Sequence, residues 1–425
     1  MSLDVVWDVV WDVVDSDGPL LDLLPALQRD LGEAERFVFV SGGPGGNEGV
    51  VGVGVAARAD VGTGTDRFAR ARDWLAALAP DATAGPLAFA SFTFDPSDGS
   101  SVMVVPRVAL WRSGGVTRRM RVGPDASAPD MPKPIPGRAA VGPLDVGVRD
   151  RPRYAGSTVR DERWLEAVAE ALTHIDAGRF EKVVLARDLH LWSKCPFDVD
   201  RLLADLTVRF PSCMTFLVDG LVGASPERLL RRTGTGISSR VLAGTARRGS
   251  DDAEDARLGA ALLASEKDLR EHDLALRSAV DALAPFCSEL QAPDAPSLVR
   301  LDNVQHLGSD IAGTLAPADD ADVPHVLALV DRLHPTAAVG GSPRDAALEA
   351  VAALEGMERG RYAGPVGWCT PDGDGEFAIA LRCAEVRGER ARLFAGAGIV
   401  AGSLPEAELT ETWLKLQAMT GVLDG

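Results

Sequence analysis

Short apolar runs separated by Gly, Pro and Asp fill the first 150 residues. The runs 36–40 (RFVFV), 87–92 (LAFASF) and 102–105 (VMVV) have the length and the flanking residues of strands. The stretch 123–137 is rich in Pro, Asp and Ala and predicts a surface connection. We therefore expect residues 1–150 to form a β-rich N-terminal part.

A longer, helical periodicity begins beyond Tyr154. Residues 161–177 predict an amphipathic helix that ends at Gly178 and is followed by a strand. Further helices are expected over 253–283, from about 346, and over 405–419, and further strands over 378–386 and 391–395. Because helices and strands do not alternate strictly, the pattern predicts an α+β fold, with sheets packed together and flanked by helices. We expect residues 1–425 to form one domain whose catalytic core is 155–425.

Composition narrows the classes of function. The chain has 425 residues and a net charge of −18, which argues against a general nucleic-acid binder because phosphate neutralisation needs clustered Lys and Arg. An anionic substrate would therefore need a local cationic pocket or a metal. No apolar run approaches the roughly 20 residues of a membrane span, and the acidic start is not a signal peptide. Five widely spaced cysteines without a CxxC pair suit reduced thiols in the cytoplasm.

Lys182 is the first candidate for chemistry. It precedes the apolar run Val183-Val184-Leu185, so its amine is expected to be partly desolvated. Desolvation disfavours a charged amine and can provide a base near neutral pH. The alternative is a lysine whose ammonium reaches water from the end of a strand.

The last predicted helix carries charges on one narrow arc. Ser403 and Glu406 have the spacing of a capping box, and Leu409, Trp413 and Leu416 are expected to share an apolar face. Glu408, Glu411 and Lys415 fall on a separate arc of about 60°. The arc is either a solvated face or a pair of carboxylates for a cation with a lysine for an anionic group.

A second acidic pair lies in the segment SEKDLREH, residues 265–272. Asp268 and Glu271 share a helix face, although Asp268 could simply complete a cap with Ser265. Two carboxylate pairs on separate helices would suit Mg²⁺, which prefers oxygen ligands. Zinc is not expected, because His272 and His306 lack ligand spacing.

Three other polar residues interrupt apolar segments. Glu227 is either an exposed turn acid or a protonated carboxyl that could act as a general acid. His306 belongs to the core or to a pocket. Arg382, within an apolar strand, needs a partner such as a ligand carboxylate held by two hydrogen bonds.

Two glycine-rich stretches do not indicate nucleotide binding. The stretch 41–46 lacks the Gly-Lys-Ser/Thr of a P-loop and is interpreted as a turn. The stretch 396–401 matches GxGxxA, but only 24 residues follow Ala401, too few for the rest of a dinucleotide fold. Its glycines are expected to let backbone approach a ligand closely.

Taken in order, these segments resemble the chorismate-utilising family, which includes isochorismate synthase, salicylate synthase and the large subunit of anthranilate synthase. The matching motifs cover most of 155–425. They are EKVVLAR (181–187), SPERLL (225–230), LAGTARRG (242–249), SEKDLREH (265–272), VQHLGSDIAGTL (304–315), HPTAAVGGSPR (334–344), RGRYAGPVGW (359–368), AIALRCAEV (378–386) and AGAGIVAGSLPEAELTETWLKL (395–416). The N-terminal 150 residues match only weakly.

The resemblance implies an enzyme, most similar to the isochorismate-forming branch. That branch converts chorismate reversibly to isochorismate with Mg²⁺, adding water at C2 of the ring while hydroxyl leaves C4. The alternative is salicylate synthase, which goes on to eliminate pyruvate. A non-catalytic relative is a third reading, disfavoured by the retained acids and lysine. Nothing suggests an obligate assembly, so a monomer or weak oligomer is expected.

The resemblance also assigns residues. Lys182 matches the lysine that activates water, and Glu227 matches the acid that protonates the departing hydroxyl. The acids that match the Mg²⁺ site are Glu271, Glu408 and Glu411, with Asp268 doubtful because relatives may carry Glu there. Residues that match substrate-binding positions are Arg382, Tyr362, Lys415, Gly398, Gly244, Thr245 and His306. Lys182 argues against the ammonia-using anthranilate synthases.

Overall fold

The computed structural model describes residues 8–424 except 17, 30, 32–33, 43–47, 79–84, 124–150 and 317–322. The predicted connection at 123–137 lies almost wholly outside the described residues, as does most of the turn at 41–46. The five cysteines are all unpaired. Among the described helices, none is long and apolar enough to cross a membrane.

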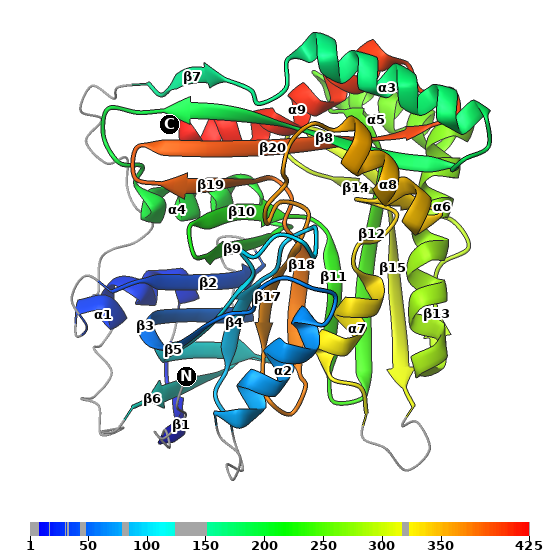
Figure 1. Cartoon of the computed structure of the whole chain (residues 1–425). Coiled ribbons are helices and arrows are strands. Elements are labelled where there is room, and N and C mark those ends of the chain that lie inside the picture. The colour runs from blue at the N-terminus through cyan, green and yellow to red at the C-terminus, as the bar shows by residue number, and fades with distance from the viewer. Residues whose placement is uncertain are drawn as a thin grey trace.

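The described strands and helices form an α+β fold, as the sequence predicts (Figure 1). The N-terminal elements are β1 (Val9–Val14), α1 (Leu24–Arg29), β2 (Arg36–Ser41), β3 (Glu48–Asp60), α2 (Arg67–Ala77), β4 (Ala88–Ser91), β5 (Val102–Ser113) and β6 (Val116–Val122). The middle elements are β7 (Arg153–Gly156), α3 (Asp161–Asp176), β8 (Lys182–Trp192), α4 (Val199–Arg209), β9 (Met214–Val218), β10 (Leu221–Ser225), β11 (Arg228–Thr233), β12 (Gly236–Arg247), α5 (Asp252–Leu263) and α6 (Glu266–Leu283). The C-terminal elements are β13 (Cys287–Gln291), β14 (Ser297–Arg300), β15 (Val304–Leu315), α7 (Val326–Leu333), β16 (Gly341–Ser342), α8 (Arg344–Leu354), β17 (Pro365–Cys369), β18 (Gly375–Ile379), β19 (Cys383–Arg387), β20 (Arg390–Val400) and α9 (Pro405–Leu423).

All the described strand pairs are antiparallel. One run of neighbours leads β8–β20–β19–β10–β9–β2–β3–β5, and a second leads β5–β4–β17–β18–β11–β12–β15. Figure 1 shows the first run stacked on the left and the second upright on the right. The N-terminal strands thus pair directly with strands of residues 155–425, at β2–β9 and β4–β17.

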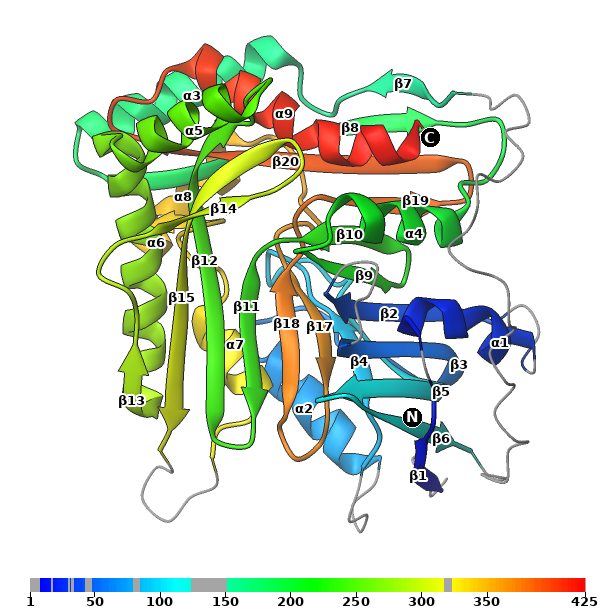
Figure 2. The ribbon, with the colours of Figure 1, turned by 180° about the vertical axis from the view of Figure 1, so that it is seen from behind.

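Helices cover the outer side of the sheets at the end that carries β8 and β20. Helices α3 and α9 lie along these two strands, and α6 runs beside β12 and β15, as both views show (Figures 1 and 2). The predicted helix at 161–177 is confirmed, with Trp164, Val168 and Ile175 buried. Gly178 follows it with a φ of 71°, which favours glycine.

Several predicted boundaries were wrong. The helix expected over 253–283 is two helices, because Ser265 starts a new one: its hydroxyl accepts the backbone N–H of Asp268. The strand expected over 378–386 is also two, β18 and β19, separated by Arg382 in the left-handed region at φ 48°. Arg382 therefore lies in a break between strands rather than inside one.

The predicted cap of α9 is also wrong. Leu404 is its N-cap residue, and the Ser403 hydroxyl instead accepts the backbone N–H of Val400. Trp413 is 37% exposed, whereas Leu416 is buried and Glu408 is only 2% exposed. The guanidinium of Arg187 covers the Trp413 ring at 4.6 Å. The Glu408 carboxylate thus points inward, which excludes the solvated-face interpretation for this residue.

Candidate active site

A narrow cavity gathers most of the predicted site residues. It lies where β8, β20, β12 and α6 meet, and nine of the thirteen line it: Glu227, Gly244, Thr245, Glu271, His306, Tyr362, Arg382, Gly398 and Lys415. The other four are Lys182, Asp268, Glu408 and Glu411. The cavity volume is about 50 Å³, well below the 300 Å³ or more usual for ligand pockets, so its side chains must move when a ligand enters.

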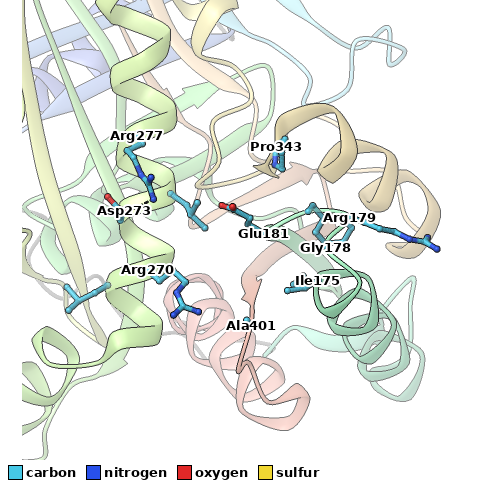
Figure 3. Close-up of a pocket in the computed structure, with 12 residues that line it drawn as sticks. Ile175, Gly178, Arg179, Glu181, Arg270, Asp273, Arg277, Pro343 and Ala401 are labelled. Carbon is cyan, nitrogen blue, oxygen red and sulfur yellow. Dashed lines mark hydrogen bonds and ion pairs between the residues drawn. The ribbon is translucent and has the colours of Figure 1, made fainter.

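A larger groove lies between α6 and the segment 178–181 that precedes β8. It measures about 860 Å³, and Figure 3 shows Glu181 directed toward the helix that bears Arg270, Asp273 and Arg277. None of the thirteen predicted residues lines it. Converging charges, rather than volume, therefore identify the narrow cavity as the candidate site.

Lys182 is the first residue of β8 and is fully buried. The strand is paired on both sides there, opposite Val400 of β20 and Ser342 of β16. The ammonium lies 3.2 Å from the Glu271 carboxylate, without the alignment of a hydrogen bond to any described group. Such complete burial excludes the solvent-reaching alternative.

Gly398 leaves the space in which these two side chains meet. A Cβ atom at this position would lie 2.1 Å from the Glu271 carboxylate oxygen and 3.0 Å from Cε of Lys182. The glycine therefore allows a lysine–carboxylate contact to lie directly on β20. The sequence suggested a close approach by a ligand, whereas the described contact is with the protein's own side chains.

Glu227 follows β10 and is 3% exposed. Burial raises its pKa to about 8, although the N–H of Leu242 and the charges of Lys182 and Arg382 act in the opposite direction. The carboxyl is therefore mainly protonated at neutral pH and can donate a proton. The exposed-turn interpretation of Glu227 is wrong.

Arg382 and His306 form a polar chain across the cavity. Arg382 Nη2 donates to His306 Nε2 at 3.0 Å, so the proton of a neutral His306 ring is on Nδ1. Nδ1 faces the Thr245 hydroxyl at 3.1 Å and the Gly244 carbonyl at 3.3 Å. Burial and the positive charge of Arg382 lower the pKa of His306 well below its ordinary value. His306 thus belongs to the pocket, where it holds Arg382.

The guanidinium of Arg382 retains an unused donor. Its Nε is buried and has no hydrogen-bond partner among the described groups. A buried donor without a partner costs free energy, which a ligand carboxylate can recover. Tyr362, stacked on Phe394 with ring centroids 5.0 Å apart, lines the same cavity. On the opposite wall, Lys415 donates to the Gly396 carbonyl at 2.8 Å.

The four predicted metal-site acids lie beside three lysines. Lys267 contacts Glu408 at 2.6 Å, Lys415 contacts Glu411 at 2.5 Å, and the third pair is the one between Lys182 and Glu271. Burial raises the pKa of Asp268, and the charges of Glu271 and Glu411 add to this effect. Burial also raises the pKa of Glu408, with Glu411 as the next cause.

These residues fit Mg²⁺ in donor type and charge. Four carboxylates offer the oxygen ligands that this ion prefers, and they outnumber the three lysines beside them. In the described part of the chain, no group of three His, Cys, Asp or Glu side chains is arranged to hold a metal ion, and lysines are paired with three of the four predicted acids. A cation would therefore have to exchange with a lysine.

Lys267 is a residue that our sequence analysis missed. Burial lowers its pKa, but attraction to Glu408 and Glu271 outweighs burial and raises that pKa above its ordinary value. A signal was present in composition: only five of the 44 Lys and Arg residues are lysines, and three of these five contact the predicted metal-site acids.

Comparison with known proteins finds relatives that cover most of the chain. The family model of the chorismate binding enzymes matches residues 14–424. Isochorismate synthase DhbC of Bacillus subtilis is 41% identical over 295 residues, which cover 65% of this chain and 73% of that protein. Isochorismate synthase MenF of the same organism is 35% identical over 361 residues, 80% and 75% of the two chains. The solved structure of MenF, the menaquinone-specific isochorismate synthase from Escherichia coli, superposes with a TM-score of 0.77 at 27% identity, covering 99% of this chain and 95% of that one.

Proposed function

The chain belongs to the chorismate-binding enzyme family, and we propose that it is an isochorismate synthase that interconverts chorismate and isochorismate. Relatives that carry this activity in their names match it at 35–41% identity over most of its length. The five unpaired cysteines suit a reducing compartment such as the cytoplasm, where we place the reaction.

One observation supports the chemistry most directly: a buried amine and a protonated carboxyl adjoin the same cavity. Water is a poor nucleophile and hydroxide a poor leaving group, so each needs a proton transfer. In the forward direction the neutral amine form of Lys182 would take a proton from the water that forms the bond to C2. Glu227 would give its proton to the hydroxyl that leaves C4 as water, and the ring double bonds shift to accommodate both changes.

Substrate binding would use the unpaired donor of Arg382. Its guanidinium, with the Tyr362 hydroxyl and Lys415 nearby, would hold the enolpyruvyl carboxylate in a protein whose net charge is −18. Arg382 is fixed by His306, so little side-chain entropy remains to be lost on binding. Gly244 and Thr245 would line the ring, and Gly398 keeps the space for Lys182.

Glu271, Glu408 and Glu411 are the residues that would hold Mg²⁺, with Asp268 acting through water. The ion would neutralise the ring carboxylate of the substrate against these acids. The role of the protein's own residues is to supply an oxygen-rich, buried donor set and to exclude bulk water.

Product analysis tests the proposal. Purified protein with chorismate and Mg²⁺ is expected to give an equilibrium mixture with isochorismate, and a chelator should abolish it. Salicylate with pyruvate would instead identify a salicylate synthase, and chorismate binding without product would indicate a non-catalytic relative.

Variants separate the two proton-transfer roles from the fold. Lys182→Ala should lose turnover while retaining a native circular dichroism spectrum, and turnover near the wild-type rate would exclude Lys182 as the base. Exposed Lys194 provides the matched control, since Lys194→Ala should leave turnover unchanged.

A further inference from the structure

The contact between Lys267 and Glu408 is the ion pair that joins the first turns of α6 and α9. The two side chains meet at 2.6 Å, and Glu408 is 2% exposed. A lysine in the first turn of a helix is disfavoured, because the backbone N–H groups there already carry partial positive charge. Attraction to the neighbouring carboxylates of Glu408 and Glu271 offsets this unfavourable position of Lys267.

Of the three lysines beside the acids, Lys267 is the one that can leave. Its side chain is 31% exposed, against 0% for Lys182 and 14% for Lys415. Lys415 is further held by the Gly396 carbonyl. Lys267 alone therefore has a route by which its ammonium can pass into water while its carboxylate stays buried.

The choice of lysine supports exchange. Thirty-nine of the 44 Lys and Arg residues are arginines (44 less the five lysines), yet the cation beside Glu408 is a lysine. A guanidinium would hold the carboxylate with two parallel hydrogen bonds, whereas an ammonium is a compact, strongly hydrated charge that is displaced more easily.

We propose that Lys267 is an exchangeable counter-ion of Glu408, which a divalent cation displaces on binding, so that this ion pair sets the affinity of the site for the cation. The inference rests on the metal site of the proposed function. Separating the Lys267–Glu408 ion pair costs free energy, and this cost reduces the net affinity of the site for the cation.

Calorimetric titration with Mg²⁺ alone, on the full-length chain, tests the inference. Lys267→Met leaves the buried Glu408 without a positively charged partner, so it should bind Mg²⁺ about tenfold more tightly than the wild type. Lys267→Arg should bind it several-fold more weakly, because the guanidinium competes better. The exposed Lys194→Met is the matched control and should equal the wild type.

Thermal unfolding gives a readout that does not depend on turnover. Without Mg²⁺, Lys267→Met should melt below the wild type, and its melting temperature should rise more on adding Mg²⁺. If Lys267→Met does not fold, Lys267→Arg provides the test: weaker Mg²⁺ binding than the wild type supports the inference, and equal or tighter binding contradicts it. If the wild type binds Mg²⁺ and Lys267→Met binds it no more tightly, the counter-ion inference is wrong while the proposed metal site stands. No Mg²⁺ binding by any of these proteins would overturn the metal site as well.

Discussion

The acid Glu227 lies in surroundings that penalise its ionised form. Lys182 and Arg382 are near enough to lower its pKa, but burial dominates and raises that pKa to about 8. The carboxyl is thus held in the form that a general acid needs, at a cost to the folded state when the pH is high.

Replacing Glu227 with Gln should make the protein more stable near pH 8 but not near pH 4.5. The unfolded carboxyl has its ordinary pKa of 4.5, so the folded state binds the extra proton between pH 4.5 and about 8. Stability of the wild type therefore falls as the pH rises through this window, and Gln removes that loss, on the order of 5 kcal/mol. Calorimetric melting temperatures of both proteins at the two pH values measure the difference.

The exposed Glu406 in the first turn of α9 supplies the control. Glu406→Gln should show no comparable dependence of its melting-temperature difference on pH. A Glu227→Gln difference that stayed constant from pH 4.5 to 8 would contradict a raised pKa. Turnover of Glu227→Gln should be strongly reduced at both pH values, since the amide has no proton to give.

The sequence named the candidate site residues, but it did not predict their surroundings. The spacing of Glu408 and Glu411 placed them on one arc of a helix, but it left open whether that arc faced water. Burial of Glu408 depends on α6, which is more than 100 residues away along the chain and brings Lys267 against it. Long-range contacts of this kind have no local signature in the periodicity of α9.

At the scale of elements, the edge of β8 shows how the strand that begins with Lys182 is held. Strands β16 and β7 pair only with its two ends, at 182–183 and 190–192. Between these two ends, the N–H of Val184 donates to the Gly340 carbonyl at 2.9 Å, and two side chains also hydrogen-bond the backbone of β8. Glu355 accepts the N–H of Ala186 at 2.8 Å, and Arg359 donates to the carbonyl of Val184 at 2.8 Å.

This pair also reaches the wall of the cavity. Arg359 donates to Glu355 through Nε at 2.7 Å and to the carbonyl of Val339 at 2.8 Å. Val184 and Val339 both line the candidate site. The ion pair therefore fixes the strand that begins with Lys182 against the loop opposite it.

Replacing Arg359 with Met should destabilise the fold by about 3–5 kcal/mol, because it leaves the buried Glu355 carboxylate unpaired. Adding Glu355→Gln to the same chain should recover part of the loss. Urea unfolding of the single and double variants measures both free energies. A single variant as stable as the wild type would show that the pair does not hold β8.

Breaks between elements were the weakest part of the sequence prediction. The run 378–386 is apolar throughout apart from Arg382 and Glu385, so its periodicity indicated one strand. The structure interrupts it where Arg382 takes a positive φ and turns its guanidinium toward His306. A strained backbone at a functional residue is favoured by tertiary contacts, which a local pattern does not contain.

At the scale of the whole molecule, the N-terminal part is built into the sheet. β2 pairs with β9 and β4 pairs with β17, and both β9 and β17 are buried throughout. Phe92 and Phe377 meet in the shared core with ring centroids 6.3 Å apart. Residues 1–150 matched the family motifs weakly, yet they complete the sheet that carries the site.

We therefore propose that the chain folds as one domain, and we predict that residues 151–425 alone will aggregate. Removing the N-terminal part would expose one edge each of β9 and β17, two strands that are now buried throughout, and such unpaired edges are templates for pairing with other chains. The full chain should unfold in a single calorimetric transition, because its two parts share one core. Light scattering of the fragment and calorimetry of the full chain are the measurements.

A shorter deletion distinguishes the loss of sheet edges from the loss of chain length. β1 pairs with β6 at the margin of the sheet, so a chain that begins after Val14 should stay soluble and retain turnover. It would lose the contact between Trp11 and Trp111, at 6.0 Å, and melt at a somewhat lower temperature. A soluble, monomeric 151–425 fragment that converts chorismate would contradict the single domain, since β9 and β17 would then need no partner from the N-terminal part.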